Sequence, residues 1–280
     1  EEGLREGLRE LGYVEGKSIV IEWRRSTGTH EQLQLLAADL IRSKVDLIVT
    51  AGAVAARAAM ETTKTVPVLF HVGDPVARGF AASLARPGGN GTGVSVISAE
   101  LIAKRLELLH VIAPKAKRIV YLRNPSNPNA QQLLDEVQKA GRTLGLRVEI
   151  LDASNIPEID AALNKLRRGT ANGCLVGGDL LYLSERSRIS RALREARLPA
   201  VFAYMEFHED GALASYGPSL KATMHALATY VDKILKGAKP AELPIEQISK
   251  YQLVIDLRVA RETGVTVPLE LLLRADEVIR

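Results

Sequence analysis

Short apolar runs alternate with amphipathic segments along most of the chain. The runs DLIVT (residues 46–50), PVLFHV (67–72) and RIVYLR (118–123) have the length and the apolar content of buried strands. Between such runs, residues 30–43 and 130–144 place leucine and alanine at helical spacing on one face. Strands that are apolar on both faces are typical of parallel sheets covered by helices, so the pattern predicts an α/β protein.

The same reasoning predicts elements along the rest of the chain. The alternation breaks at Pro114 and then restarts, which predicts two Rossmann-like lobes in succession and not one barrel. The Thr29 and Gln32 spacing indicates a capped helix start. Further strands are expected at 18–23, 92–97, 147–151, 173–177, 200–204, 212–216 and 251–257, and further helices at 1–12, 54–62, 99–112, 158–167, 186–196 and 219–236.

The last part of the chain cannot form a third core of useful size. It offers one long helix and two strands, so we expect it to return and complete the two earlier lobes. Three crossovers would then join the lobes. The expected lobes are residues 1–96 with 217–250 and residues 97–216 with 251–280, and the crossovers are expected near 94–97, 214–217 and 250–253.

Composition excludes several classes of protein. The chain has 280 residues, of which 46% are hydrophobic and 25% charged, so it is not a disordered protein. The net charge of +4 is spread among interleaved acidic and basic residues, and aromatic residues make up 4%, so no nucleic-acid partner is expected. The single cysteine, Cys174, lies in an apolar run and is expected to be a core residue.

No catalytic or cofactor motif is present. The segment GGNGTG (residues 88–93) precedes a predicted strand, whereas a dinucleotide fingerprint follows one and opens a helix. There is no P-loop and no G-x-S-x-G elbow, and the five histidines are scattered. The sequence therefore predicts no catalytic residue, no metal site and no cofactor.

Polar residues and small residues gather where the predicted strands end. In open α/β sheets, ligands bind at the carboxyl ends of the strands, so these positions are the candidate ligand site. Turn formation and helix capping remain the alternative reading of each position taken alone. The candidate ligand-binding residues are Ala51, Gly52, Ala53, Asp74, Asn124, Ser126, Asn127, Asp179, Tyr204 and Glu206.

Different roles are expected within this set. Gly52 opens a predicted helix, where a side chain would block the approach of an anionic group to backbone N–H groups. Asp179 or Glu206 is expected to meet an ammonium group, because a buried cation needs a carboxylate. Asp74, which precedes Pro75, is expected mainly to form a turn.

Several longer segments carry a resemblance to a known family. The chain resembles ABC-transporter substrate-binding proteins of the family that includes tryptophan- and tyrosine-type binding components. The resemblance implies the type I periplasmic binding protein fold, with two lobes, three crossovers and a ligand cleft. It also implies a periplasmic or lipid-anchored location. The segments are residues 8–24, 38–52, 67–80, 84–95, 211–219 and 251–279.

The leading functional hypothesis is a monomeric, non-enzymatic solute receptor. It would close over a small molecule by hinge bending and pass it to an ABC permease. The resemblance suggests an amino acid, in particular an aromatic one. Two alternatives stay open: the ligand-sensing part of a transcription regulator or signalling receptor with this fold, and an enzyme on a double Rossmann scaffold.

Overall fold

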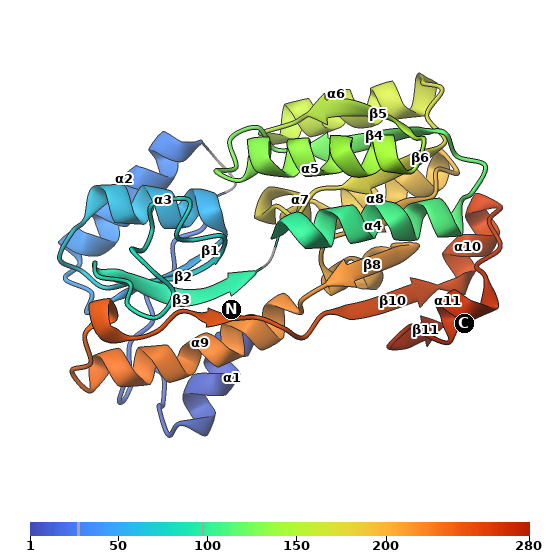
Figure 1. Cartoon of the computed structure of the whole chain (residues 1–280). Helices are drawn as coiled ribbons and strands as arrows, with labels where there is room; N and C mark the ends of the chain where they lie inside the picture. Colours follow the sequence, from blue (N-terminus) through green and yellow to red (C-terminus); the bar gives the residue numbers. More distant parts are fainter. Residues whose placement is uncertain (27–28, 97) are drawn as a thin grey trace. The chain divides into compact units, whose positions relative to one another are not determined.

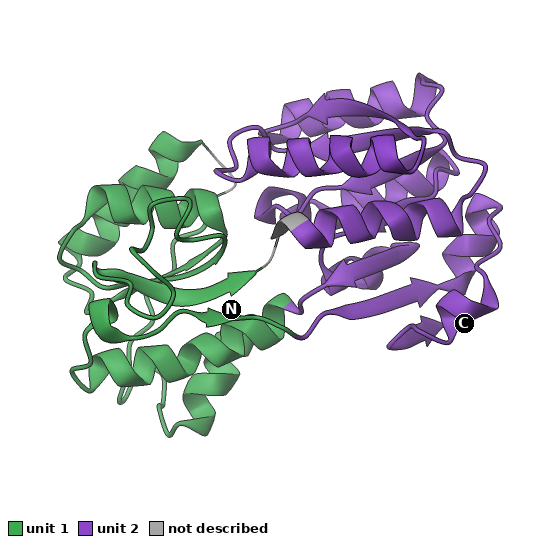
Figure 2. Ribbon diagram, viewed as in Figure 1, with its two compact units in different colours: residues 1–97, 220–249 green, residues 98–219, 250–280 purple. Residues whose placement is uncertain are grey.

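The computed structural model describes residues 1–26, 29–96 and 98–280. The chain divides into two compact units, each assembled from separate stretches of sequence (Figure 2). Unit 1 comprises Glu1–Ile97 and Leu220–Ser249, and unit 2 comprises Ser98–Ser219 and Lys250–Arg280. The chain therefore passes three times from one unit to the other, and the first passage falls at residue 97, outside the described residues.

Unit 1 is built around a parallel sheet (Figure 1). Its described strands run in the order β1-β2-β3-β9, and each neighbouring pair is parallel. The elements are α1 (Glu2–Glu10), α2 (His30–Arg42), β1 (Ile48–Ala51), α3 (Ala53–Thr62), β2 (Val68–Gly73), β3 (Gly91–Val96), α9 (Leu220–Leu235), η2 (Pro240–Glu242) and β9 (Glu246–Gln247).

Both faces of this sheet are covered, as the apolar strands predicted. On one face, Leu69 and Val94 pack in a cluster with residues of α1 and α9. On the other face, Phe70 and Val72 pack against Ala53 and its neighbours on α3. Successive residues of β2 thus belong to different clusters, which is the two-residue period of a strand buried on both sides.

Unit 2 contains the larger sheet. Its strands, among the described residues, run in the order β11-β10-β8-β7-β6-β4-β5. The elements are α4 (Ser98–Ile112), β4 (Arg118–Arg123), α5 (Ala130–Thr143), β5 (Arg147–Asp152), α6 (Ile156–Arg168), β6 (Gly173–Val176), α7 (Leu180–Ser184), α8 (Arg186–Glu195), β7 (Ala200–Phe202), η1 (Met205–Asp210), β8 (Ala214–Gly217), β10 (Gln252–Asp256), α10 (Leu257–Thr263), α11 (Leu269–Leu272) and β11 (Glu277–Ile279).

The core of unit 2 follows the same plan. Leu106 and Leu109 of α4, with Val137 of α5, belong to one large cluster on the sheet. Cys174 is fully buried in β6, which confirms its prediction as a core residue. The one antiparallel pairing described for this sheet joins β10 to β8. The apolar runs predicted parallel pairing, and this prediction is wrong for β10. The chain re-enters unit 2 just before β10, and a strand that arrives from outside the unit can enter the sheet in either direction.

The strand predicted at residues 18–23 is wrong. These residues form no ladder, and only an isolated bridge joins Glu15 to Ile19. Ile21 and Trp23 pack on the α1–α9 side of unit 1, whereas Val20 is 74% exposed. The alternation typical of a strand is present, but no described strand lies alongside to supply the hydrogen bonds of a ladder.

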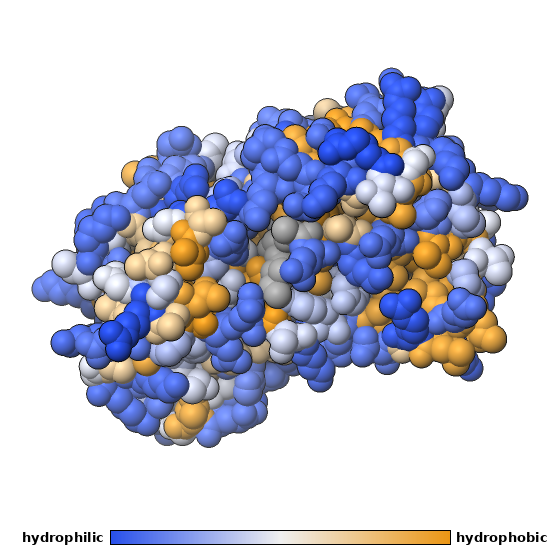
Figure 3. All heavy atoms as spheres, in the orientation of Figure 1, coloured by the Kyte–Doolittle hydropathy of each residue, from blue (hydrophilic) through white to orange (hydrophobic). Residues whose placement is uncertain are grey.

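Helix ends and short elements account for the smaller differences. The helix expected at residues 1–12 is shorter, since α1 ends at Glu10, and Leu11 just after it is 43% exposed. The sequence did not predict α7, α10 or α11, which are short. Leu269, the first residue of α11, and Leu273, which follows the helix, are 69% and 77% exposed, and apolar surface gathers over this end of unit 2 (Figure 3).

Within the described part of the chain, no helix is long and apolar enough to cross a membrane.

Candidate functional site

The carboxyl ends of β4 and β6 carry a hydrogen-bonded cluster of polar side chains. These two strands are neighbours in the sheet of unit 2. In the loop after β4, the Asn124 side-chain oxygen accepts from the backbone N–H of Ser126 at 3.0 Å. The Asn127 side-chain oxygen accepts from the backbone N–H of Asn129 at 2.9 Å. Each asparagine therefore forms an Asx turn, which fixes the shape of the loop.

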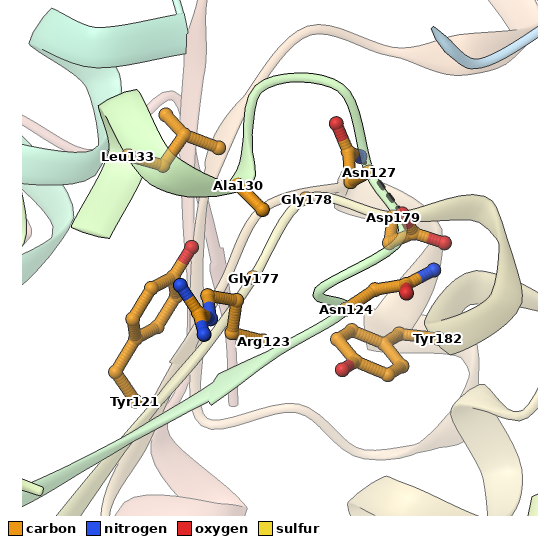
Figure 4. A pocket seen from close by; sticks show the side chains of 10 residues that line it. All are labelled: Tyr121, Arg123, Asn124, Asn127, Ala130, Leu133, Gly177, Gly178, Asp179 and Tyr182. Atoms are coloured by element: carbon orange, nitrogen blue, oxygen red, sulfur yellow. Dashed lines mark hydrogen bonds between the residues drawn. The ribbon is translucent and has the colours of Figure 1, made fainter. Parts of the chain in front are cut away.

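Asp179 joins this loop to the next strand end. It is the N-cap of α7, and its Oδ1 accepts from the backbone N–H of Leu181 at 3.0 Å. Its Oδ2 accepts from Nδ2 of Asn127 at 2.8 Å (Figure 4). Burial raises the pKa of the Asp179 carboxyl above its usual range, although hydrogen bonds from Asn127, Leu181 and Asn124 oppose that rise. The cluster thus holds a carboxylate that burial makes costly to ionise.

A small hollow lies beside this cluster. Figure 4 shows Asn127 and Asp179 on one side of it and Tyr121 and Arg123 on the other. Arg123 already has a partner, because its Nε and Nη2 donate to the two carboxylate oxygens of Asp152 at 2.8 and 2.9 Å. The residues that line the hollow are Tyr121, Arg123, Asn124, Asn127, Ala130, Leu133, Gly177, Gly178, Asp179 and Tyr182.

The structure brings together only part of the predicted set in this hollow. Asn124, Asn127 and Asp179 line it, whereas Tyr204 and Glu206, which follow β7, do not. Ser126 is exposed, and both ends of the Asn127 amide are bonded within unit 2. Asn127 therefore holds the loop in shape and has fewer free donors than the sequence suggested.

Tyr204 lies near the same edge of the sheet, and nearby charged side chains shift the pKa of its hydroxyl. The residue is 8% exposed and is the N-cap of the short 3-10 helix η1. Burial raises the pKa of its hydroxyl strongly, Asp179 and Glu206 raise it further, and Arg105 lowers it. Tyr204, Asp179 and Arg105 are thus electrostatic neighbours, although they come from different elements of unit 2.

In unit 1, the predicted positions follow β1 and β2. Gly52 has φ +82° and ψ 158°, a conformation that favours glycine, and Ala53 begins α3 behind it. The backbone N–H of Gly52 donates to the carbonyl of His71 at 3.2 Å, so this donor already has a partner. Ala51, the last residue of β1, is half-buried.

Asp74 occupies a strained turn. Its φ is +46°, and its Oδ1 accepts from the backbone N–H of Ala77 at 3.3 Å. A left-handed conformation in a residue other than glycine costs free energy and is often found at functional sites. The geometry is that of a turn-forming residue at the carboxyl edge of the unit 1 sheet.

Residues outside the predicted set also contribute. The sequence analysis did not single out Tyr121, Arg123 or Tyr182, although all three line the hollow. Arg123 ends its strand and could have been found from that position. Tyr182 lies on α7, which was not predicted, and its hydroxyl donates to the carbonyl of Ala153 at 2.8 Å. In the described part of the chain, no group of three or more His, Cys, Asp and Glu residues could hold a metal ion.

Two covered α/β sheets assembled from interleaved stretches of one chain, with polar loops at the strand ends, define the class of type I periplasmic binding proteins. The sequence profile of the family described as ABC transporter substrate binding protein matches residues 1–279, so the chain belongs to that family.

Two similar proteins bear out this assignment. A tyrosine-binding protein of Clostridioides difficile (strain R20291) is 26% identical over 257 residues, which are 91% of this chain and 74% of the relative. A solved structure, described as an ABC domain in complex with L-Trp from Streptococcus pneumonia, is 27% identical with a TM-score of 0.88. That similarity covers 99% of this chain and 94% of the other.

A more distant similarity concerns the fold alone. A LacI-family transcriptional regulator from Bifidobacterium animalis is 15% identical with a TM-score of 0.60, over 90% of this chain and 89% of the other. These similarities confirm the type I fold predicted from the sequence. Transport receptors and transcription regulators share this fold, so the fold does not by itself assign a function.

Proposed function

We propose that this protein is the solute receptor of an ABC importer and that its ligand is an aromatic amino acid of the tyrosine and tryptophan type. The observation that carries the proposal is the family match along residues 1–279. The tyrosine-binding relative and the L-Trp complex, both similar over nine-tenths of this chain or more, support the choice of ligand class.

The proposed action is capture by closure. The two units act as lobes that close over the ligand, and the three passages of the chain between them act as the hinge. The candidate residues predicted at the strand ends form the ligand site, with Asp179 or Glu206 meeting the ammonium group. The closed receptor, a monomer outside the cytoplasm, delivers the ligand to an ABC permease without chemical change.

Calorimetry on the purified protein tests the proposal. After any co-purified ligand is removed by unfolding and refolding, L-tyrosine or L-tryptophan should bind with a dissociation constant in the micromolar range or below, about −8 kcal/mol or stronger. L-leucine is the control for aromatic selectivity. Saturation should raise the free energy of unfolding, by about 2.7 kcal/mol at a hundredfold excess over Kd. If no aromatic amino acid binds, the proposed ligand class is wrong.

A second measurement addresses closure. Small-angle scattering should give a smaller radius of gyration when the ligand saturates the protein. Identical curves with and without a bound ligand would contradict hinge closure while leaving the ligand assignment intact.

A further inference from the structure

The described part of the chain buries three charged side chains, and only one of them has a counter-ion. Asp256 is fully buried, and its carboxylate accepts from Nη2 of Arg258 at 2.7 Å. Arg105 and Asp179 are 7% and 8% exposed, and neither has an ion-pair partner among the described residues. A buried charge without a counter-ion is costly, so these two residues need an explanation.

Arg105 reaches from α4 to the carboxyl edge of the unit 2 sheet. Its Nε donates to the carbonyl of Tyr216 at 2.6 Å, and its Nη2 donates to the carbonyl of Ala203 at 3.3 Å. These carbonyls belong to the ends of β8 and β7, which are neighbouring strands. Two of the roughly five N–H donors of a guanidinium are used, and Nη1 has no hydrogen-bond partner among the described residues.

A short run of contacts joins Arg105 to Asp179. Asp179 follows Gly178, and a Cβ on Gly178 would lie 3.3 Å from Cβ of Ala203. Ala203 is the residue whose carbonyl accepts from Arg105. The strands β6 and β7, which lead to these positions, are also neighbours in the sheet. The two charges therefore lie at one edge of unit 2, at adjacent strand ends, and are not paired with each other.

The electrostatic surroundings agree with this placement. Burial lowers the pKa of Arg105 to about 10 and raises the pKa of Asp179, so burial makes the charged form of each group more costly. Both charges act on the hydroxyl of Tyr204, where Asp179 adds to the effect of burial and Arg105 opposes it. Both act on Tyr121 in the same opposed sense. The edge thus presents one positive and one negative site around shared tyrosines.

An amino acid carries the complementary pair of charges on adjacent groups. We propose that Arg105 binds the α-carboxylate and Asp179 the α-ammonium of the ligand, so that unit 2 recognises the zwitterion. Arginine is suited to a carboxylate because its N–H donors lie in one plane. The two carboxylate oxygens of Asp179 accept from Asn127, Leu181 and Asn124, and since they offer about four lone pairs together, a position is left for an ammonium donor. This inference rests on the proposed function, since it requires an amino-acid ligand.

A thermodynamic cycle with truncated ligands tests the pair. The probes are L-tyrosine, tyramine, which lacks the carboxylate, and 3-(4-hydroxyphenyl)propanoate, which lacks the ammonium. Wild-type protein should bind each truncated ligand at least about tenfold more weakly than L-tyrosine, the scale of a charged hydrogen bond. Arg105→Gln should lose about tenfold or more for L-tyrosine and nothing for tyramine. Asp179→Asn should likewise lose about tenfold or more for L-tyrosine, and it should lose nothing for 3-(4-hydroxyphenyl)propanoate, which has no ammonium group.

Arg188→Gln is the matched control, because Arg188 is an arginine of the same unit whose charge is met by Asp160 and Glu185. It should leave all three affinities unchanged. If Arg105→Gln weakens L-tyrosine and tyramine by the same factor, Arg105 acts through the fold and the inference is wrong. If Asp179→Asn weakens L-tyrosine and 3-(4-hydroxyphenyl)propanoate by the same factor, Asp179 acts through the fold and the inference is wrong.

Three further outcomes separate this inference from the proposed function. If wild-type protein binds L-tyrosine but the cycles fail, only the inference is rejected. If it binds another amino acid instead, the corresponding amine and acid replace the tyrosine analogues in the same cycles. If it binds no amino acid, the proposed function and the inference are both rejected.

A folding defect in Arg105→Gln would not hide the result. Arg105→Lys keeps the positive charge, so it should keep discrimination against tyramine while reducing the affinity for L-tyrosine. Loss of that discrimination in a folded Arg105→Lys protein, checked by circular dichroism, would overturn the assignment of the carboxylate.

Discussion

Unit 1 buries a histidine as a neutral side chain within its sheet, whereas unit 2 buries two charged side chains at the edge of its sheet. His71, in β2 of unit 1, is 4% exposed, and neither ring nitrogen has a hydrogen-bond partner in the described structure. Arg105 and Asp179 of unit 2 keep hydrogen bonds but have no counter-ion among the residues that the structure describes. The difference teaches that burial alone does not mark a site. A neutral buried group is compatible with a core role, whereas an uncompensated charge at a strand end points to a ligand.

The two units also hold histidine differently, since His71 is buried and His208 is half-buried. His208 of unit 2 pairs through Nε2 with the hydroxyl of Ser215 at 2.6 Å, whereas His71 has no such partner. Burial lowers the pKa of both rings to about 4. The two rings therefore have similar pKa values, although only His208 has a side-chain hydrogen bond. Substitutions should therefore differ in their effect on the free energy of unfolding.

The largest expected effects come from glycines packed against backbone. A Cβ on Gly93 of unit 1 would lie 2.1 Å from the carbonyl oxygen of Phe70, and one on Gly217 of unit 2 would lie 2.0 Å from that of Ala203. Each Gly→Ala change should lower the free energy of unfolding by at least about 3 kcal/mol in urea titrations. Gly217→Ala should also abolish ligand binding, because it displaces the carbonyl that holds Arg105.

Gly89→Ala is the control for these changes, since nothing lies within 4 Å of its Cβ position. It should alter stability by less than about 1 kcal/mol. Binding retained at full strength in a folded Gly217→Ala protein would contradict the link between this strand end and the ligand.

Acid should destabilise both units through their histidines. The folded-state pKa is about 4 in each case, against 6.5 for a free histidine. Between these values the unfolded chain binds protons that the folded chain does not, so the free energy of unfolding falls as pH falls from 6.5 toward 4. Each ring contributes up to about 3 kcal/mol of this loss.

Leucine substitutions should distinguish the two rings in urea titrations at several pH values. His71→Leu should flatten the acid dependence and cost little near neutral pH, because no hydrogen bond is lost. His208→Leu should also flatten it but cost about 1–3 kcal/mol at every pH, because Ser215 loses its partner. Undiminished acid sensitivity in both variants would show that other groups cause it.

An exchange of side chains within unit 2 should separate the fold from charge recognition. Asp179→Asn places an amide against Nδ2 of Asn127, whose other end is fixed by the N–H of Asn129. Stability should fall by about 1–3 kcal/mol. Adding Asn127→Asp restores a donor–acceptor pair, so stability should recover while L-tyrosine binding stays at least about tenfold weak. Recovery of binding together with stability would mean that Asp179 only holds the loop.

The smallest effects should come from helix caps in the two units. In unit 2, Asn155 accepts from the N–H of Glu158 at 3.0 Å and donates to its carboxylate at 2.9 Å. In unit 1, Thr29 accepts from the N–H of Gln32 at 3.4 Å. Asn155→Ala should cost about 1 kcal/mol and Thr29→Ala about half of that, measured by thermal unfolding. The reverse order would contradict the hydrogen-bond geometry.

The elements with a strong local pattern could be predicted from the sequence. The helix expected at 30–43 is α2, and the Thr29–Gln32 cap is present. The strand expected at 118–123 is β4. These features depend on residues close together in the chain, where periodicity and capping act. The strand expected at 18–23 has the right alternation but no neighbour, because strand formation depends on a partner that the segment does not contain.

The candidate site divides in the same way. Asn127 and Asp179 were predicted because each follows an apolar strand, and parallel strands bring their carboxyl ends to one edge. Arg105 gave no such signal. It lies in the middle of a long amphipathic helix, where an arginine is usually part of the solvated face. Only the packing of α4 on the sheet carries its guanidinium to the ends of β7 and β8.

Most of the strands and helices, the covered sheets and the strand ends that carry polar residues could be predicted from the sequence, because local propensity and hydrophobic period specify them. The tertiary structure alone decided which buried charges have counter-ions, which direction β10 takes beside β8 and which segments find a ladder partner. The direction of β10, the ladder partners and the surroundings of Arg105 depend on groups far apart in the chain. Asp256 finds Arg258 two residues away, whereas Arg105 meets the carbonyls of Ala203 and Tyr216 only after the sheet has formed.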